Sequence, residues 1–249
     1  MKQKKSWAVK ILIGILALLM IATAGFFVFV SSSYEANPSV LKRLQSDDLV
    51  TVKEDGDIAF EPVSDASEIG FIFYPGAKVE ASAYAAMAKG IAAKGFPVFI
   101  ADLPFNLAIL SPNYADQIIH DHPEIKRWVI GGHSLGGVMA SDYALEHENV
   151  EGLVLLASYP QSKTDLSKTS LNVLSIWGSN DEVADLEKVK NAKKSMPSNA
   201  EFIEVKGGNH GGFGEYGHQK GDGESSLPGN QQIQDTIGYV AAFLERLNE

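Results

Sequence analysis

Apolar residues follow two different patterns along this chain. The first is an unbroken run from Ile11 to Val30, which holds no charged residue. At a rise of about 1.5 Å per residue, roughly 20 helical residues cross the roughly 30 Å hydrocarbon core of a bilayer. Residues 1–30 therefore predict a lysine-flanked transmembrane helix.

The residues that flank this run indicate its orientation. No acidic residue precedes Glu35, whereas lysine occupies four positions before or at the start of the run: Lys2, Lys4, Lys5 and Lys10. Positive charge favours the cytoplasmic side, so we expect a single-pass cell-membrane protein whose C-terminal domain lies outside the cytoplasm. A cleaved signal peptide is the alternative, because residues 22–24 match the A-x-A processing pattern and cleavage near Ala24 would secrete the domain. The apolar run continues to Val30, which is longer than a usual signal core and favours the anchor.

The second pattern is an alternation of short strand-like and helix-like segments. Residues 31–48 are polar and predict a linker, so one folded domain is expected over residues 49–249. The expected strands cover residues 58–61, 70–74, 98–101, 128–130, 153–156, 171–177 and 201–205. The expected helices cover residues 83–94, with Ser82 as N-cap and Gly95 at the end, then 114–119, 138–146, 184–194 and 232–247. This alternation predicts an α/β fold with a doubly wound, mostly parallel sheet of about seven or eight strands.

Composition excludes several kinds of chemistry. The chain has no cysteine, which rules out disulfides, a thiolate nucleophile and a Cys-ligated metal. Four of its 21 Lys and Arg residues lie before Ile11, so 17 remain against 31 Asp and Glu, and the exported part carries 14 net negative charges. Such a field repels nucleic acid and anionic lipid headgroups, so we expect neither as a partner of the folded domain.

One short motif carries most of the functional information. Residues 132–136 read Gly-His-Ser-Leu-Gly and join the strand at 128–130 to the helix at 138–146. A G-x-S-x-G between a strand and a helix is typical of a nucleophile elbow, a strained turn that exposes the serine hydroxyl. The flanking glycines fit because a side chain there would collide with the neighbouring strand or helix. We therefore expect Ser134 to be a nucleophile.

A serine hydroxyl needs a base, and the base needs an orienting acid. In this architecture the order along the chain is serine, acid, histidine, each after a strand. Asp181 follows the strand at 171–177, and His210 follows the strand at 201–205. Glu182 and His218 are the alternatives for the acid and the base.

These residues predict an esterase mechanism. His210 activates Ser134, Asp181 fixes the imidazole, and water hydrolyses the acyl-enzyme. The oxyanion formed on the way needs backbone donors. We expect them to be the N–H groups of Leu135 and of Ala77, with Gly76 or Lys78 as alternatives to Ala77.

Four segments together resemble the alpha/beta-hydrolase superfamily, and in particular its cap-less bacterial branch close to dienelactone hydrolases: residues 74–79, 104–108, 131–137, and 208–210 with 213–214. The resemblance spans about residues 49–249 and implies the alpha/beta-hydrolase fold, the triad Ser134, Asp181 and His210, and no cofactor. Only 13 residues, 158–170, separate the two strands after the elbow, which leaves no room for a cap domain. Dienelactone hydrolases use a cysteine nucleophile, so their particular activity is not expected of this chain.

We therefore expect a membrane-anchored, extracytoplasmic serine hydrolase that cleaves a small-molecule or lipid carboxylic ester. A lipase-like hydrolase, an acyltransferase of the same fold and a non-catalytic binding scaffold are the alternatives. No metal site is expected, because residues 120–122 (His-Asp-His) fit a surface helix end better than a zinc site. We interpret the glycine-rich residues 207–229 as a flap beside the site.

Overall fold

The chain folds as two separate units in the computed structural model, which describes the backbone of residues 2–248 and the side chains of residues 7–248. The units are Met1–Ser33 and Tyr34–Glu249. The first contains helix α1 (Lys2–Val30), in which Trp7–Val30 is long and apolar enough to cross a membrane, a test that a signal sequence also passes. The side chains of Lys2, Lys4 and Lys5, on which the predicted orientation depends, lie outside the described residues.

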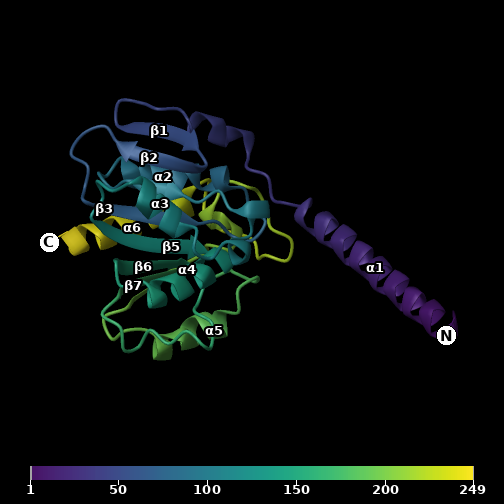
Figure 1. Cartoon of the computed structure of the whole chain (residues 1–249). Coiled ribbons are helices and arrows are strands. Elements are labelled where there is room, and N and C mark those ends of the chain that lie inside the picture. Colours follow the sequence, from purple (N-terminus) through teal and green to yellow (C-terminus); the bar gives the residue numbers. More distant parts are fainter. Residues whose placement is uncertain (1, 249) are drawn as a thin grey trace. The chain divides into compact units, whose positions relative to one another are not determined.

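The second unit is built on an eight-stranded sheet with the order β1-β2-β4-β3-β5-β6-β7-β8 (Figure 1). The strands are β1 (Val50–Asp55), β2 (Asp57–Pro62), β3 (Ile69–Tyr74), β4 (Val98–Ile100), β5 (Arg127–His133), β6 (Val150–Leu156), β7 (Asn172–Gly178) and β8 (Glu201–Val205). β1 and β2 pair antiparallel, as do β2 and β4, and the other pairs are parallel. The predicted α/β fold with a mostly parallel sheet is confirmed.

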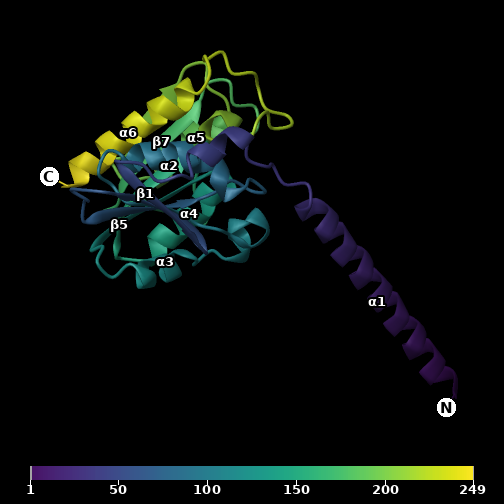
Figure 2. The same cartoon turned by 90° about the horizontal axis from the view of Figure 1, so that it is seen from above.

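Helices cover both faces of the sheet (Figures 1 and 2). They are α2 (Ala85–Ala92), α3 (Ala115–Asp121), α4 (Leu135–Glu146), α5 (Leu186–Asn191) and α6 (Gln231–Asn248). Successive strand side chains point to opposite faces. Phe71 and Phe73 accordingly join the core under α2 and α6, whereas Ile72 joins the core under α3 and α4.

The structure differs from the sequence prediction at the first helix and the first strand. The prediction that Ser82 caps the first helix is wrong. Ala81–Tyr84 forms a 3-10 helix, and α2 begins at Ala85 without a side-chain cap. β1 is an additional strand at the sheet edge, and its last three residues are exposed. Because only one end of β1 is buried, its sequence lacks the apolar run that marks the central strands.

The folded unit begins at Tyr34 rather than at residue 49. Tyr34 forms an isolated parallel bridge with Val79, and Pro38–Lys42 forms a 3-10 helix that buries Val40. The polar composition of residues 31–48 conceals these contacts because few apolar positions carry them.

The parallel strands place several loops at one edge of the sheet. β4 and β5 lie on opposite sides of β3, so the carboxyl end of β3 is a topological switch point, the place where ligands bind in open α/β sheets. Residues 157–171, all of them described, form no helix or strand between β6 and β7. As predicted from the short spacing, no cap domain is inserted there.

Candidate active site

Ser134 lies in the sharp turn between β5 and α4. Its backbone has φ 52° and ψ −122°, a conformation that costs a non-glycine residue about 1–3 kcal/mol. Two hydrogen bonds hold it: the Ser134 N–H donates to the Leu156 carbonyl at 2.9 Å, and the Ser158 hydroxyl donates to the Ser134 carbonyl at 2.7 Å. β6 and the loop that follows it thus hold the strained turn that the motif predicts.

The two motif glycines allow this turn because they let backbone segments touch. A Cβ on Gly132 would overlap the backbone of Gly136 and Gly137 at the start of α4. A Cβ on Gly136 would overlap the carbonyls of Tyr74 and Pro75, where β3 ends. The start of α4 therefore packs directly on the loop that follows β3.

Asp181 and His210, which follow β7 and β8, form a buried pair. The His210 Nδ1 lies 2.9 Å from the Asp181 Oδ2, and the two residues are 1% and 4% exposed. The other oxygen, Oδ1, accepts the N–H groups of Val183 at 2.9 Å and Ala184 at 2.8 Å. The carboxylate is thereby fixed so that it receives the proton of Nδ1.

The second ring nitrogen of His210 is left without a partner. Nε2 is buried and makes no hydrogen bond to any of the described residues. With the proton on Nδ1, Nε2 carries a lone pair and can accept a proton. That is the state a general base requires.

The alternative acid and base lie elsewhere. Glu182 is exposed, and the His218 side chain is 53% exposed and 4.0 Å from Glu224. The structure thus brings together Asp181 and His210, the first choices from the sequence.

His133, the residue before Ser134, is a buried part of the site that the sequence analysis missed. Its Nε2 lies 3.0 Å from the His210 carbonyl, and its Nδ1 lies 2.8 Å from the Tyr84 hydroxyl, which accepts the Gly76 N–H at 3.0 Å. A carbonyl only accepts, so Nε2 carries the proton and the Tyr84 hydroxyl donates to Nδ1. Burial, with a smaller contribution from His210, lowers the pKa of His133 well below 6.5, which keeps the ring neutral.

This chain of hydrogen bonds joins three parts of the site. It runs from the turn after β3, through Tyr84, to the residue beside Ser134 and on to the backbone of His210. The rings of His133 and His210 lie 4.5 Å apart, so the nucleophile turn and the base share one packed cluster. The histidine in the G-x-S-x-G motif was the available signal, but its partners lie 49 and 77 residues away.

The turn after β3 leaves one N–H free. The Val79 N–H donates to the Gly76 carbonyl at 3.1 Å, which closes the turn. The Gly76 N–H is taken by Tyr84, and the Lys78 N–H donates to Asn106 at 2.7 Å. Among the described residues, no acceptor bonds the Ala77 N–H or that of Leu135. Of the three donors considered from the sequence, the geometry leaves Ala77 available.

Asp222 is a second buried residue that the sequence analysis missed. It is 8% exposed, and its carboxylate accepts the N–H groups of His210 at 3.1 Å and Gly211 at 2.8 Å. Asn209 also donates to the Gly223 carbonyl at 2.8 Å. Within the segment interpreted as a flap, residues 222–223 are therefore hydrogen-bonded to residues 209–211.

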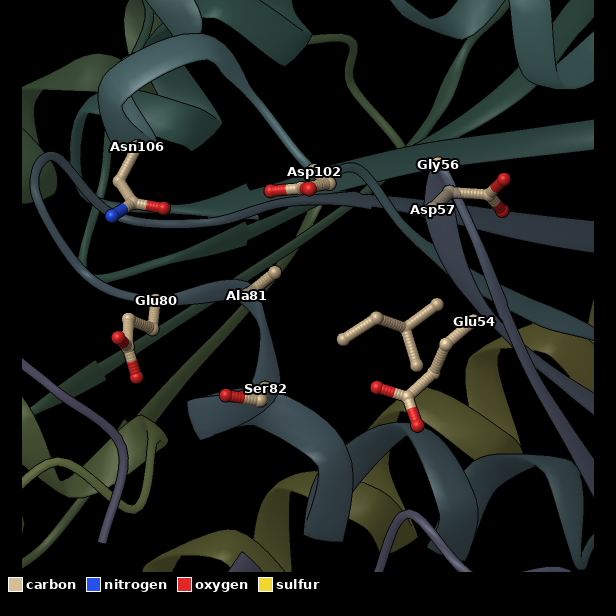
Figure 3. Close-up of a pocket in the computed structure, with 9 residues that line it drawn as sticks. Glu54, Gly56, Asp57, Glu80, Ala81, Ser82, Asp102 and Asn106 are labelled. Carbon is tan, nitrogen blue, oxygen red and sulfur yellow. The ribbon is translucent and has the colours of Figure 1, made fainter.

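A separate pocket lies between the turn that joins β1 to β2, the loop after β4 and residues 80–82 (Figure 3). It is lined by Glu54, Gly56, Asp57, Ile58, Glu80, Ala81, Ser82, Asp102 and Asn106. Burial raises the pKa of the Asp57 and Asp102 carboxyls. The lining includes none of the candidate triad residues. Within the described residues, no group of three or more acidic or histidine side chains is placed to hold a metal ion.

Comparison with known proteins gives one family and several similar folds. The family model described as alpha/beta hydrolase family matches residues 70–234. A predicted CIB-like hydrolase from Thermoplasma acidophilum is 19% identical, with a TM-score of 0.56 over 78% of this chain and 99% of that one. The esterase domain of a Rhodothermus marinus protein is 12% identical, with a TM-score of 0.60 over 79% of this chain and 97% of that one.

A third similar structure is an alpha/beta hydrolase enzyme from a sediment metagenome of the Mar Chica lagoon, Morocco. It is 16% identical, with a TM-score of 0.57 over 80% of this chain and 100% of that one. No curated protein matches the chain.

Because backbone atoms approach Gly136 closely, adding even one methyl group there should destabilise the fold strongly. We expect Gly136→Ala to lower the free energy of unfolding by about 3 kcal/mol, because its methyl group would overlap two backbone carbonyls. Gly238→Ala is the control, since that exposed position in α6 has no atom within 4 Å of the added Cβ and should gain up to about 1 kcal/mol. Urea unfolding of the full chain in neutral detergent measures both. Equal stability of the two variants would contradict the packing described.

The buried, neutral His133 predicts a pH-dependent stability. The unfolded chain binds a proton on this ring below about pH 6.5, whereas the folded protein does not until a much lower pH. The contribution of neutral His133 to the free energy of unfolding is thus fully present above pH 6.5. As the pH falls, this contribution is lost by up to about 1.4 kcal/mol per pH unit. Urea midpoints between pH 7.5 and 5 should fall less steeply for His133→Gln. Parallel curves for the two proteins would show that His133 does not titrate in this way.

Proposed function

Because this chain belongs to the alpha/beta hydrolase family, we propose that it is a serine hydrolase that cleaves carboxylic esters through an acyl-enzyme on Ser134. The observation that carries the proposal is the Asp181–His210 pair, with one buried ring nitrogen left unpaired next to the strained serine turn. The matched region, residues 70–234, contains the whole candidate triad.

The proposed reaction proceeds in two halves. His210 Nε2 takes the hydroxyl proton as Ser134 Oγ bonds to the ester carbonyl carbon, and the same proton passes to the departing alkoxide as its C–O bond breaks. Water then attacks the acyl-enzyme by the same route and releases the acid. Asp181 remains ionised and stabilises the imidazolium.

The oxyanion of each half-reaction needs donors already in place. The N–H groups of Leu135 and Ala77 are free, and the contact of Gly136 with the loop after β3 brings their backbone segments together. Such fixed donors stabilise developing charge without reorganising during the reaction.

None of the hydrogen bonds among the described residues joins Ser134 Oγ to His210 Nε2. Catalytic hydrogen bonds are often long without substrate and tighten in the complex. The ring contact between His133 and His210 supports the proposal because it keeps the base beside the serine turn.

We further propose that α1 anchors the protein in the cell membrane with the hydrolase domain outside the cytoplasm. Its 24-residue apolar span and the lysines before it support this placement. The domain would then act on esters outside the cell or in the bilayer itself.

Replacing the nucleophile should abolish both labelling and turnover. We expect Ser134→Ala to lower kcat about 10⁴-fold or more on p-nitrophenyl acetate and to remove covalent labelling by a fluorophosphonate probe. Ser170→Ala, at an exposed serine before β7, should keep both. Labelling that persists in Ser134→Ala would refute the assignment, and a folded wild-type protein that takes no label would favour a non-catalytic scaffold.

Asp181 and Glu182 are neighbours, so matched substitutions at the two positions test which one acts as the acid of the triad. Asp181→Asn should lower kcat about 10⁴-fold with little change in KM, because an amide opposite Nδ1 favours the wrong imidazole tautomer. Glu182→Gln removes the same charge one residue away, at an exposed position, and should leave kcat within about twofold. Similar losses in the two variants would show that Asp181 has no special role.

A further inference from the structure

The segment that follows the membrane helix is built into the edge of the domain that carries the site. The Tyr34 N–H donates to the Lys78 carbonyl at 2.6 Å, and the Glu80 N–H donates back to the Tyr34 carbonyl at 3.1 Å. Lys78 directly follows Ala77, the expected oxyanion donor. Residue 34 is thus paired with the oxyanion turn itself.

The same segment also contacts the loop that follows His210. The Asn37 N–H donates to the Glu215 carbonyl at 2.7 Å, and the rings of Tyr34 and Tyr216 lie 5.7 Å apart. Residues 34–37 therefore bind two of the loops that form the site.

Chain length limits how far this edge can lie from the end of the membrane helix. α1 ends at Val30, and four peptide steps separate Val30 from Tyr34. An extended chain covers at most about 14 Å in four steps. The limit follows from the covalent chain and holds for every angle between helix and domain.

A loop at the same edge exposes large apolar side chains. The loop after β4 presents Phe105, Ile109 and Leu110, which are 48%, 56% and 48% exposed. It is fixed rather than loose, because Leu107 and Ala108 are buried within it. The Asn106 carbonyl accepts the Lys78 N–H, which ties the loop to the oxyanion turn.

This concentration of apolar side chains is unusual on the domain. Elsewhere in residues 34–248, no stretch of six described residues exposes more than one large apolar side chain. Contiguous apolar patches on soluble domains mark protein or membrane interaction sites. Next to a membrane tether, insertion into the boundary between headgroups and acyl chains removes such side chains from water.

We propose that the edge carrying the site docks on the bilayer through the loop 105–110 and that the substrate is an ester lipid of that bilayer. The inference rests on the proposed esterase activity and on α1 as an anchor. Water and the lipid ester react to give a fatty acid and the deacylated lipid, with the acyl group carried in between on Ser134. The loop holds the site at the depth where the ester bonds lie.

The test compares two double variants of the full chain in vesicles of phosphatidylcholine, whose zero net charge avoids repulsion by the acidic domain. Ile109→Ser with Leu110→Ser removes the docking side chains. Leu49→Ser with Val63→Ser is the control, because these residues are 64% and 56% exposed and lie at the opposite edge of the sheet. Each protein is assayed on a fluorogenic phosphatidylcholine in the same vesicles and on water-soluble p-nitrophenyl acetate.

We expect the Ile109/Leu110 variant to lose at least about tenfold in lipid hydrolysis and to keep its rate on the soluble ester. The control variant should keep both rates. Equal lipid hydrolysis by the two variants would overturn the docking surface. Cleavage of the soluble ester without any lipid hydrolysis by the wild type would overturn the lipid substrate, while failure on both esters would instead refute the proposed function.

A label gives a second measurement that does not depend on activity. Since the chain has no cysteine, Leu110→Cys or Val63→Cys can carry a single environment-sensitive dye. A quencher in the lipid phase should quench the dye at position 110 and not at position 63. Equal quenching at the two positions would overturn the docking orientation.

Discussion

The direct contact between the start of α4 and the end of β3 is the constraint on which the site depends. It exists only because Gly132 and Gly136 carry no side chain, so that helix and strand backbones meet without a layer between them. This contact sets the position of the Leu135 N–H relative to the loop that carries Ala77. It also forces Ser134 into the left-handed region, where hydrogen bonds to neighbouring strands hold it. The positions of the proposed nucleophile and of the proposed oxyanion donors therefore both depend on one packing arrangement.

Two buried histidines, His210 and His133, lie in different surroundings, which suit them to different roles. Both are 1% exposed or less. His210 faces the Asp181 carboxylate through Nδ1, and its Nε2 has no partner among the described residues. His133 faces a hydroxyl and a carbonyl, and its burial keeps it neutral. The first is suited to chemistry and the second to holding loops in place.

The sequence predicted those features that depend on local pattern. Central strands are buried on both faces and read as apolar runs, and the candidate triad follows strand ends in a fixed order. Features with distant partners were missed. Tyr84 and His133 meet across 49 residues, and Asp222 reaches back to His210 across 12. The start of the domain at Tyr34 was missed for the same reason, because its partner is Val79.

Because the folded unit begins at Tyr34, whether the apolar helix is retained is a separate question from whether the site forms. Cleavage near Ala24 would remove most of the apolar helix, but it would leave residues 34–37 and their bonds to the oxyanion turn. The hydrogen bonds of the proposed site therefore lie within the unit Tyr34–Glu249 and do not involve the helix. As the proposed anchor, the helix would confine the site to the bilayer surface, where the local concentration of ester lipid is high. Under this proposal, retention of the helix governs which substrate the site meets, while the chemistry is set by the domain alone.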